Sequence, residues 1–269
     1  MGLSLREKNS PPDTLDCTGT ESVTLHRTVR FGERAMIDPE AVMAGAGWLS
    51  GQPPEFRRRV IELAKLRHFE AGERVCEAGD PPGDLYGLVE GELTVHIAPD
   101  DIAPLMVHIA QPGWWMGEAA LMTRTPRRVS MTARRPSWLL CLGPEAIGRM
   151  AAEDPETWRR LAHITVSHLD HALGTIATLT ATDPRIRVAV ALRRVIGLAD
   201  GLPSSAVVDL SQEELGELAR LTRNALRPVL VDFERRGLIR RSYRRIEIPD
   251  VDALVRFARK IAADPVPLR

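Results

Sequence analysis

One short segment in the middle of the chain combines the residue types that hold a sugar phosphate. Gly117 precedes Glu118, and Arg127 and Arg128 end the same segment. A glycine lets a ligand approach the backbone, N–H groups at the start of a helical turn attract anions, and an arginine can clamp charged oxygens. A carboxylate repels phosphate but accepts hydrogen bonds from ribose hydroxyls. The segment therefore indicates a sugar-phosphate site, although Glu118 and Arg127 could equally form a structural ion pair.

A second group of residues has the chemistry of DNA recognition. Between Arg223 and Arg245 the chain carries eight arginines against two acidic residues. Arginine can bind guanine through two hydrogen bonds and asparagine can do the same with adenine, so Arg223, Asn224 and Arg227 are candidates for reading base edges. Nearby arginines would contact phosphates and add salt-dependent affinity: Arg240, Arg241, Arg244 and Arg245. A solvated helix face is the plainer interpretation of such a run of charges. The position of the run in the fold decides between this interpretation and DNA binding.

Other constellations point away from catalysis and metal binding. The sequence has no catalytic triad, P-loop or metal-hydrolase spacing, so we expect no catalytic residue and no enzyme activity. His168 and His171 are three residues apart, a spacing that metals can use, and His163 lies nearby. Only Asp170 accompanies them, so we interpret the histidines as exposed or interfacial polar residues and expect no metal site.

Short strands with glycine turns would position the first group of residues. From His68 to about Leu142, glycines recur at short intervals between alternating segments such as 93–97 and 106–109. This texture is typical of an antiparallel sandwich or barrel. A helix is predicted before it, around 53–66.

A long helix is predicted next, between residues 151 and 182. Residues at alternating spacings of four and three along it form a seam of period 3.5, which favours pairing with another helix. The seam consists of Trp158, Ala162, Thr165, Leu169, Ala172, Ile176 and Leu179. It is weakly hydrophobic, so packing of one helix on its own sandwich is the alternative to a homodimer.

The arginine run belongs to a predicted helix-turn-helix. Ser211, followed by Gln212 and then by glutamate at the third position, is a capping box that opens one helix. Thr222 can cap a second helix that carries Arg223, Asn224 and Arg227 in its first turns. Two strands, at 238–239 and 246–248, read as a β-hairpin wing. Such a motif places the N-terminal part of its second helix in the major groove.

Charge and composition fit this organisation. The 269 residues carry 36 basic and 36 acidic side chains, but the part from Asp183 onward is +5 and the part before it is −5. An asymmetry of this kind suggests that one part faces a polyanion. Neither a secretory signal nor an apolar run of membrane length is present, and Cys17, Cys76 and Cys141 are isolated, so we expect a cytoplasmic protein in a reducing compartment without membrane contact.

The order of these parts resembles the family of bacterial regulators typified by the cyclic-AMP receptor protein and the fumarate–nitrate regulator. Residues 69–73, 77–80, 85–86 with Gly91, 117–121 and 126–127 resemble its cyclic-nucleotide-binding β-roll, and residues 210–224 with 237–239 resemble its DNA-binding module. The resemblance covers roughly residues 55–255. The fumarate–nitrate branch has an N-terminal cysteine cluster, whereas this chain has only Cys17 there, which argues against an iron–sulfur cluster.

The resemblance implies roles for individual residues. Glu118 would hold the ribose 2′-hydroxyl and Arg127 the cyclic phosphate, while Arg128 replaces a residue that is usually small. An ungapped count puts the base-reading positions at Asp170 and His171, where a carboxylate could accept from a guanine edge. The implied nucleotide site is Gly117, Glu118, Ala119, Arg127, Arg128, Asp170 and His171, and the implied DNA site is Ser211, Gln212, Thr222, Arg223, Asn224, Arg227 and Arg244.

We therefore expect an α+β chain in five segments. These are an N-terminal extension (1–45), a cyclic-nucleotide-binding-like β-roll of the jelly-roll type (46–150), a dimerisation helix (151–182), a winged helix-turn-helix domain (183–255) and a C-terminal tail (256–269). The leading hypothesis is a homodimeric transcription regulator whose effector is cyclic AMP or cyclic GMP, with no obligatory cofactor. Its expected partners are palindromic promoter DNA and RNA polymerase.

Two alternatives stay open at this point. In the first, Arg128 and Val129 block the pocket, and the protein binds DNA constitutively or answers to partner proteins. In the second, a cyclic-nucleotide module regulates a partner protein and the helix-turn-helix makes protein contacts.

Overall fold

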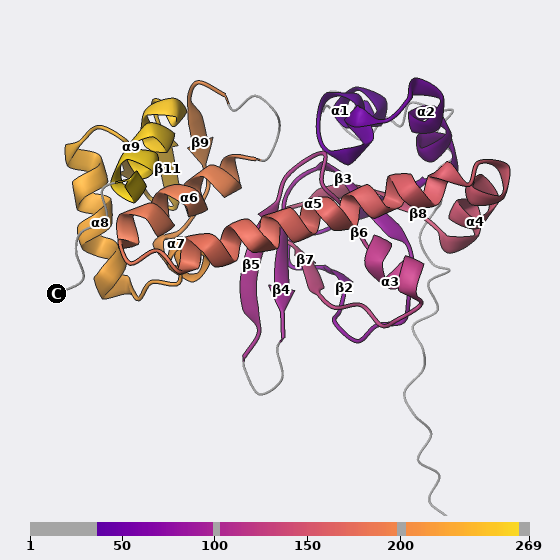
Figure 1. Ribbon diagram of the computed structural model, residues 1–269, viewed down its shortest axis with the longest axis horizontal. Helices are drawn as coiled ribbons and strands as arrows, with labels where there is room; N and C mark the ends of the chain where they lie inside the picture. Colours follow the sequence, from indigo (N-terminus) through magenta and orange to yellow (C-terminus); the bar gives the residue numbers. More distant parts are fainter. Residues whose placement is uncertain (1–36, 99–102, 198–202, 264–269) are drawn as a thin grey trace, which may run out of the picture.

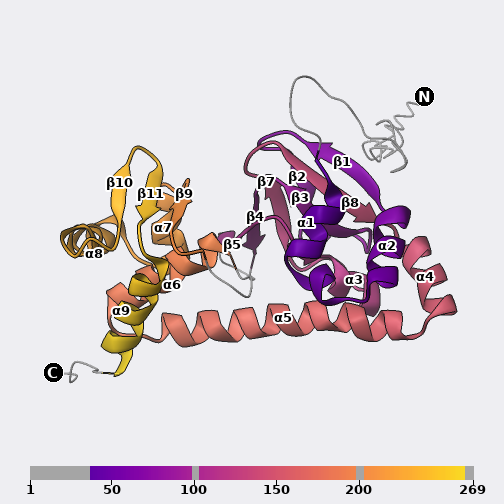
Figure 2. The ribbon, with the colours of Figure 1, turned by 90° about the horizontal axis from the view of Figure 1, so that it is seen from above.

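The computed structural model describes residues 37–98, 103–197 and 203–263. A β-roll and a smaller C-terminal domain lie at opposite ends, and one long helix runs past both (Figures 1 and 2). The first 36 residues of the predicted extension, Cys17 among them, and residues 264–269 of the predicted tail lie outside the described part. None of the described helices is long and apolar enough to cross a bilayer.

Two antiparallel four-stranded sheets form the β-roll, in the orders β1-β8-β3-β6 and β2-β7-β4-β5. Large apolar side chains such as Trp115 and Phe69 fill the core between and beside them. Cys76 and Cys141 are buried free thiols, and burial raises their pKa values to about 11 and about 12. The strands are β1 (Lys65–Phe69), β2 (Arg74–Cys76), β3 (Leu85–Glu90), β4 (Leu93–Ile97), β5 (Leu105–Ala110), β6 (Trp115–Met116), β7 (Ser130–Ala133) and β8 (Ser137–Leu142).

Part of the predicted N-terminal extension belongs to the roll. Asp38 caps α1 (Pro39–Gly45) by accepting from two backbone N–H groups, and Met43 of this helix is fully buried in the same core as Trp115. The 3-10 helix η1 (Trp48–Gly51) and α2 (Pro54–Leu63) continue the layer. The boundary at residue 45 is therefore wrong, because α1 is too short for a clear apolar period and its tertiary contacts hold it in place.

The predicted helix 151–182 is two helices in the structure. Chain direction changes at Asp154, between α4 (Pro144–Glu153) and α5 (Glu156–Leu179), and Pro155 precedes the first turn of α5. At about 1.5 Å per residue the 24 residues of α5 span roughly 36 Å. Residues 180–183 then link α5 to α6 (Pro184–Ile196), which Asp183 caps.

The C-terminal domain is a winged helix-turn-helix. A capping box of Ser211 and Glu214 opens α7 (Gln212–Ala219), Arg220 turns the chain in a left-handed conformation, and Thr222 caps α8 (Arg223–Arg235). The wing is a three-stranded sheet in the order β10-β11-β9, formed by β9 (Ala206–Val208), β10 (Arg240–Ser242) and β11 (Arg245–Ile248).

Two details of this domain correct the expectations. The first strand of the predicted hairpin is β10 (Arg240–Ser242) and not 238–239, because Leu238 and Ile239 are buried in the domain core. The predicted tail from residue 256 is also wrong as far as Ala263, since α9 (Val251–Ala263) continues through it. Phe257 of α9 packs against Phe233 of α8 with ring centroids 5.5 Å apart, which fastens the helix to the domain.

Candidate functional site

The predicted phosphate segment forms a tight turn between β6 and the short helix α3 (Glu118–Thr123). Gly117 has φ +109°, a conformation that side chains with a Cβ rarely adopt. A Cβ atom there would lie 2.7 Å from the carbonyl oxygen of Asp84 and 3.0 Å from Nη1 of Arg127. The glycine therefore brings the backbone against the arginine side chain.

Glu118 is buried, with 3% of its surface exposed, and faces the long helix. Its Oε1 accepts a hydrogen bond from Oγ1 of Thr165 at 3.1 Å and lies 3.2 Å from Nδ1 of His168. Both partners come from α5, so the carboxylate connects the roll to the helix that leads to the C-terminal domain.

Arg127 is also buried, at 7% exposure, but has different partners. Its Nη2 donates to the carbonyl oxygen of Asp84 at 2.9 Å, and its guanidinium lies over the ring of Tyr86, 5.0 Å from the centroid. Within the described residues Arg127 forms no ion pair, with Glu118 or any other carboxylate. The structural ion pair that the sequence left open is therefore absent there.

The sequence neighbours of Glu118 and Arg127 differ in their exposure to solvent. Arg128 is exposed, so it does not fill the space beside Arg127, whereas Val129 packs on the roll core. Ala119 is half-buried, and its carbonyl oxygen accepts a hydrogen bond from Thr123 of the same helix.

The face of α5 that meets the roll carries an aromatic and histidine cluster. Trp114 stacks on His168 with ring centroids 4.8 Å apart, lies 5.5 Å from His171 and lies 4.3 Å from His108 of β5. Burial lowers the pKa of His108 to about 3 and also lowers that of His171. The indole Nε1 of Trp114 and Nε2 of His108 are buried without a hydrogen-bond partner. The cluster therefore presents aromatic faces and two unpartnered buried nitrogens.

Sequence reasoning found part of this cluster. His171 lies in it, whereas Asp170 is exposed, and the α5 partners of Glu118 are Thr165 and His168. Thr165, His168, Trp114 and His108 were missed as site residues. The three-residue spacing of Thr165, His168 and His171 could have indicated one helix face, but nothing local shows that Glu118 meets that face. None of the described residues forms a group of three or more ligands suited to a metal ion.

The second predicted site lies on α8. Arg223, Asn224 and Arg227 are exposed, and none of them forms an ion pair within the described chain, while Leu226 and Leu230 on the opposite side are buried. The hydroxyl groups of Thr222 and Ser211 accept hydrogen bonds from backbone N–H groups and so cap α8 and α7, while Gln212 is exposed at the start of α7.

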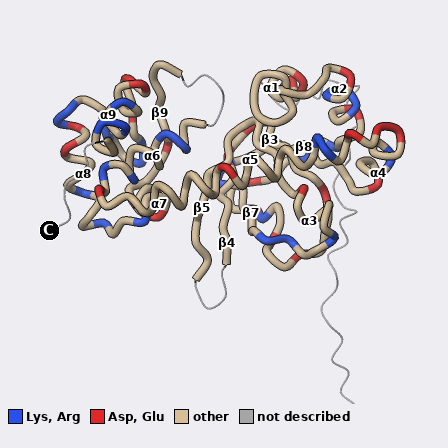
Figure 3. Tube along the Cα trace, in the orientation of Figure 1, with Lys and Arg blue, Asp and Glu red and all other residues tan. Residues whose placement is uncertain are grey.

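The other arginines of the run divide into two groups. Asp232 pairs with Arg235 and Arg236, while Arg240 and Arg241 pair with Glu247 and Glu234, so these guanidiniums are engaged inside the domain. Arg244 and Arg245 are exposed at the wing tip without ion pairs, and Figure 3 shows basic and acidic positions interleaved over this domain. Phosphate contact through Arg240 and Arg241 therefore has less structural basis than through the wing tip.

An ion-pair network joins the C-terminal domain to the roll. Arg134, which follows β7, pairs with Glu92 of the roll and, at 2.8 Å, with Glu214 of α7. Arg135 adds contacts to Glu92 and Asp209. Burial alone would raise the pKa of Glu214, but hydrogen bonds from Arg134 and Ser211 lower it to about 2. Glu214 is therefore ionised at neutral pH, where it can pair with Arg134.

Arg134→Ala is expected to lower the free energy of unfolding by about 2 kcal/mol at pH 7, less than a fully buried pair because the three side chains keep 11–19% exposure. The depressed pKa of Glu214 gives stability that is complete above its ordinary value near 4.5 and is lost as pH falls toward 2. Denaturant unfolding at pH 7 and pH 3 should show a smaller difference between wild type and variant at pH 3. Arg135→Ala, at a 40% exposed side chain, is the control and should cost less than about 1 kcal/mol. An equal difference at both pH values would contradict the assignment.

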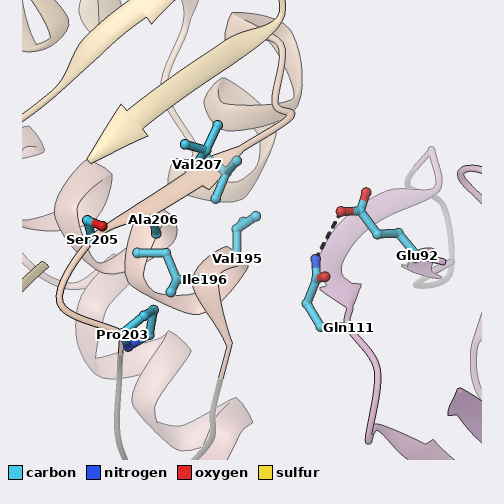
Figure 4. A pocket seen from close by; sticks show the side chains of 9 residues that line it. Glu92, Gln111, Val195, Ile196, Pro203, Ser205, Ala206 and Val207 are labelled. Carbon is cyan, nitrogen blue, oxygen red and sulfur yellow. Dashed lines mark hydrogen bonds between the residues drawn. The ribbon is translucent and has the colours of Figure 1, made fainter. Parts of the chain in front are cut away.

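A half-open cavity of about 220 Å³ lies beside this network, between the two domains (Figure 4). Glu92 and Gln111 line it from the roll, and Val195, Ile196 and β9 line it from the C-terminal domain. It does not include Glu118 or Arg127, so it is separate from the predicted nucleotide site.

Comparison with known proteins gives the same two modules. The family model of a cyclic nucleotide-binding domain matches residues 66–154, and that of a Crp-like helix-turn-helix domain matches residues 186–257. The CRP-like cAMP-activated global transcriptional regulator of Mycobacterium tuberculosis is 26% identical over 223 residues, which are 82% of this chain and 100% of that protein.

Two proteins of Thermus thermophilus are similarly related. Transcriptional regulator LdrP is 30% identical over 200 residues, covering 72% of this chain and 96% of that protein. The crystal structure of a CRP-family transcriptional regulator superposes with a TM-score of 0.57 at 27% identity, covering 71% of this chain and 96% of that one. With both modules present in the same order over nearly the whole of these regulators, the chain belongs to the Crp/Fnr family of transcription regulators.

Proposed function

We propose that this regulator binds DNA as a homodimer under the control of a cyclic nucleotide held at Glu118 and Arg127. One observation carries the proposal: Glu118 and Arg127, two side chains of opposite charge type near Gly117, are 3% and 7% exposed, yet they do not pair with each other. Burying separate charges costs free energy. A ligand with a hydroxyl for the carboxylate and an anionic phosphate for the guanidinium would offset that cost.

The ligand would exchange contacts that already exist. A ribose hydroxyl donating to Glu118 would compete with Thr165 and His168, and a cyclic phosphate at Arg127 would replace or supplement the carbonyl oxygen of Asp84. The base would lie toward Trp114, whose flat ring suits stacking. The proposed nucleotide site consists of these side chains, and it requires no further cofactor.

Coupling to DNA would run through α5. Because Glu118 bonds to two α5 side chains, a ligand that takes over the carboxylate changes how the helix meets the roll. The helix leads directly into residues 180–183 and then into α6, so its shift would bias the orientation of the C-terminal domain. The ligand can move this equilibrium only by its difference in affinity for the two arrangements.

A second copy of the chain would pair along α5. Val166, Leu169, Leu173 and Ile176 leave 53–59% of their surface exposed and follow each other at spacings of three, four and three residues. That is the repeat of a coiled-coil seam. Thr165 of the predicted seam instead faces Glu118, so Val166 takes its place on the exposed stripe. Asp170 follows Leu169 and would reach a nucleotide base only from the partner's helix.

The choice between cyclic AMP and cyclic GMP has one indication. The cyclic-AMP-activated relative favours cyclic AMP. Calorimetric titration with each nucleotide, followed by gel shift with and without it, tests the function. Submillimolar binding that raises DNA affinity is expected. A DNA affinity that neither nucleotide changes would favour constitutive binding instead. That alternative supposes that Arg128 blocks the pocket, and the exposure of Arg128 gives it little support.

DNA recognition would use the unpaired residues of α8 and the wing. A palindromic promoter site would present half-sites about one helical turn apart to the two α8 helices, with Arg244 and Arg245 near phosphates. Acting at promoters places the protein in the cytoplasm with RNA polymerase as a partner. A steep fall of DNA affinity with salt concentration is expected, and its absence would favour the alternative in which this domain contacts proteins.

Arg223→Ala is expected to relax base preference at one position of each half-site, at a cost of about 1–3 kcal/mol, because a two-bond contact to guanine is lost. Binding-site selection from random DNA with wild type and variant measures this. Arg235→Ala, on the same helix but paired with Asp232, is the control that should leave the preference intact. Identical selected sites for wild type and Arg223→Ala would remove Arg223 from base recognition.

A further inference from the structure

The solvent side of α8 is not uniformly polar. Val231 is 49% exposed, and Pro228 one turn before it is exposed as well. The core side of the helix is formed by other residues, Leu226, Val229, Leu230 and Phe233, and Val231 does not belong to that core. Within α8, Val231 is the one large aliphatic side chain left in solvent.

The position of Val231 on the helix is informative. It follows Asn224 by seven residues, which is close to two turns, so both project from the same side about 10.5 Å apart. With base pairs about 3.4 Å apart, this corresponds to roughly three steps along a groove. Arg223 and Arg227 flank the same surface without ion pairs, so the apolar strip lies within the charged surface that would meet DNA.

Single exposed apolar residues are common on protein surfaces, and most need no explanation. The exposed apolar surface of α8 includes a proline, and proline is an unfavourable residue inside a helix. In a helix interior proline removes one backbone donor and crowds the preceding turn, so it is disfavoured there. Pro228 nevertheless occupies an exposed position inside α8, next to Val231 and among unpaired arginines.

We propose that Pro228 and Val231 form an apolar strip that contacts the 5-methyl group of a thymine in each half-site, about three base pairs from the base that Asn224 meets. The thymine methyl is the apolar group of the major groove, and it distinguishes thymine from the other bases. The proposal rests on the DNA-binding function and adds a base identity that the arginines and asparagine do not specify.

Deoxyuridine substitution tests the contact, because uracil differs from thymine only by the missing methyl. The full-length protein with its nucleotide first selects its site from random DNA. Each thymine of that site is then replaced singly by deoxyuridine, and affinities are measured for wild type and for Val231→Ala. One position per half-site should weaken wild-type binding about fourfold, the value of one buried methyl group, and should leave Val231→Ala unaffected.

The control is Val207→Ala, since Val207 has the same 49% exposure but lies on β9 and away from α8. It should reproduce the wild-type uridine series. A selected site whose uridine series is identical for wild type and Val231→Ala would overturn this inference alone. Failure to select any DNA would overturn the DNA-binding function together with it.

Discussion

Replacing Leu169 and Leu173 by glutamate is expected to convert the regulator into a monomer and to lower its affinity for a full palindromic site at least about a hundredfold. The two leucines are 55% and 53% exposed at the centre of the apolar stripe on α5. In a paired helix four new carboxylates would face each other in a desolvated seam, which costs far more than the lost apolar contact. One domain alone would then hold one half-site.

Analytical ultracentrifugation at micromolar protein, together with binding to full and half palindromes, measures both effects. Ser167→Glu is the matched control, because Ser167 is exposed on α5 outside the stripe. It should remain dimeric and bind as wild type does. A double variant that stays dimeric would show that the two copies associate through another surface, and the packing of α5 on its own roll would then be its main role.

Arg127→Ala is expected to lower affinity for the cyclic nucleotide at least about a hundredfold and to abolish the nucleotide-dependent rise in DNA affinity. A buried guanidinium can give a phosphate two charge-assisted hydrogen bonds, each worth about 1.5–3 kcal/mol. Arg127→Lys should recover only part of the loss, since an ammonium keeps the charge without the planar fork.

Arg128→Ala provides the control, because this neighbouring arginine is exposed. Calorimetry should give it an affinity within a few-fold of wild type. Thermal unfolding without nucleotide establishes that Arg127→Ala is folded. An undiminished nucleotide response in folded Arg127→Ala would remove Arg127 from the site.

Local chemistry explains which parts of the fold could be predicted. Capping by Ser211 and Thr222 depends on residues three positions away, so both helices of the DNA-binding motif begin where the sequence indicates. The wing strand was misplaced because Leu238 and Ile239 have the composition of a strand, yet the domain core buries them ahead of it. Short apolar runs carry no information on which neighbours will cover them.

The site itself shows the same division. Glu118 and Arg127 stand in one short segment of the sequence, and the structure buries both of them near Gly117, while their role in ligand binding stays a prediction. Asp170 stays a prediction from an ungapped count, because counting along a helix fixes a position but not the face that meets the roll. His168 faces Glu118 across 50 residues of sequence, and Arg134 meets Glu214 across 80. Such contacts arise from assembled tertiary structure and leave no local pattern.

Glu214 has two sets of donors with different attachments. Arg134 belongs to the roll, whereas the backbone N–H of Ser211, 2.8 Å from the carboxylate, begins the helix that Glu214 itself stands on. If the C-terminal domain moves away from the roll, the backbone N–H of Ser211 moves together with the Glu214 carboxylate. The first turn of α7 therefore keeps its cap. Separation of the C-terminal domain from the roll would therefore break the contacts of Arg134 and Arg135 to Glu214 and Asp209, but it would leave the capping box of α7 in place.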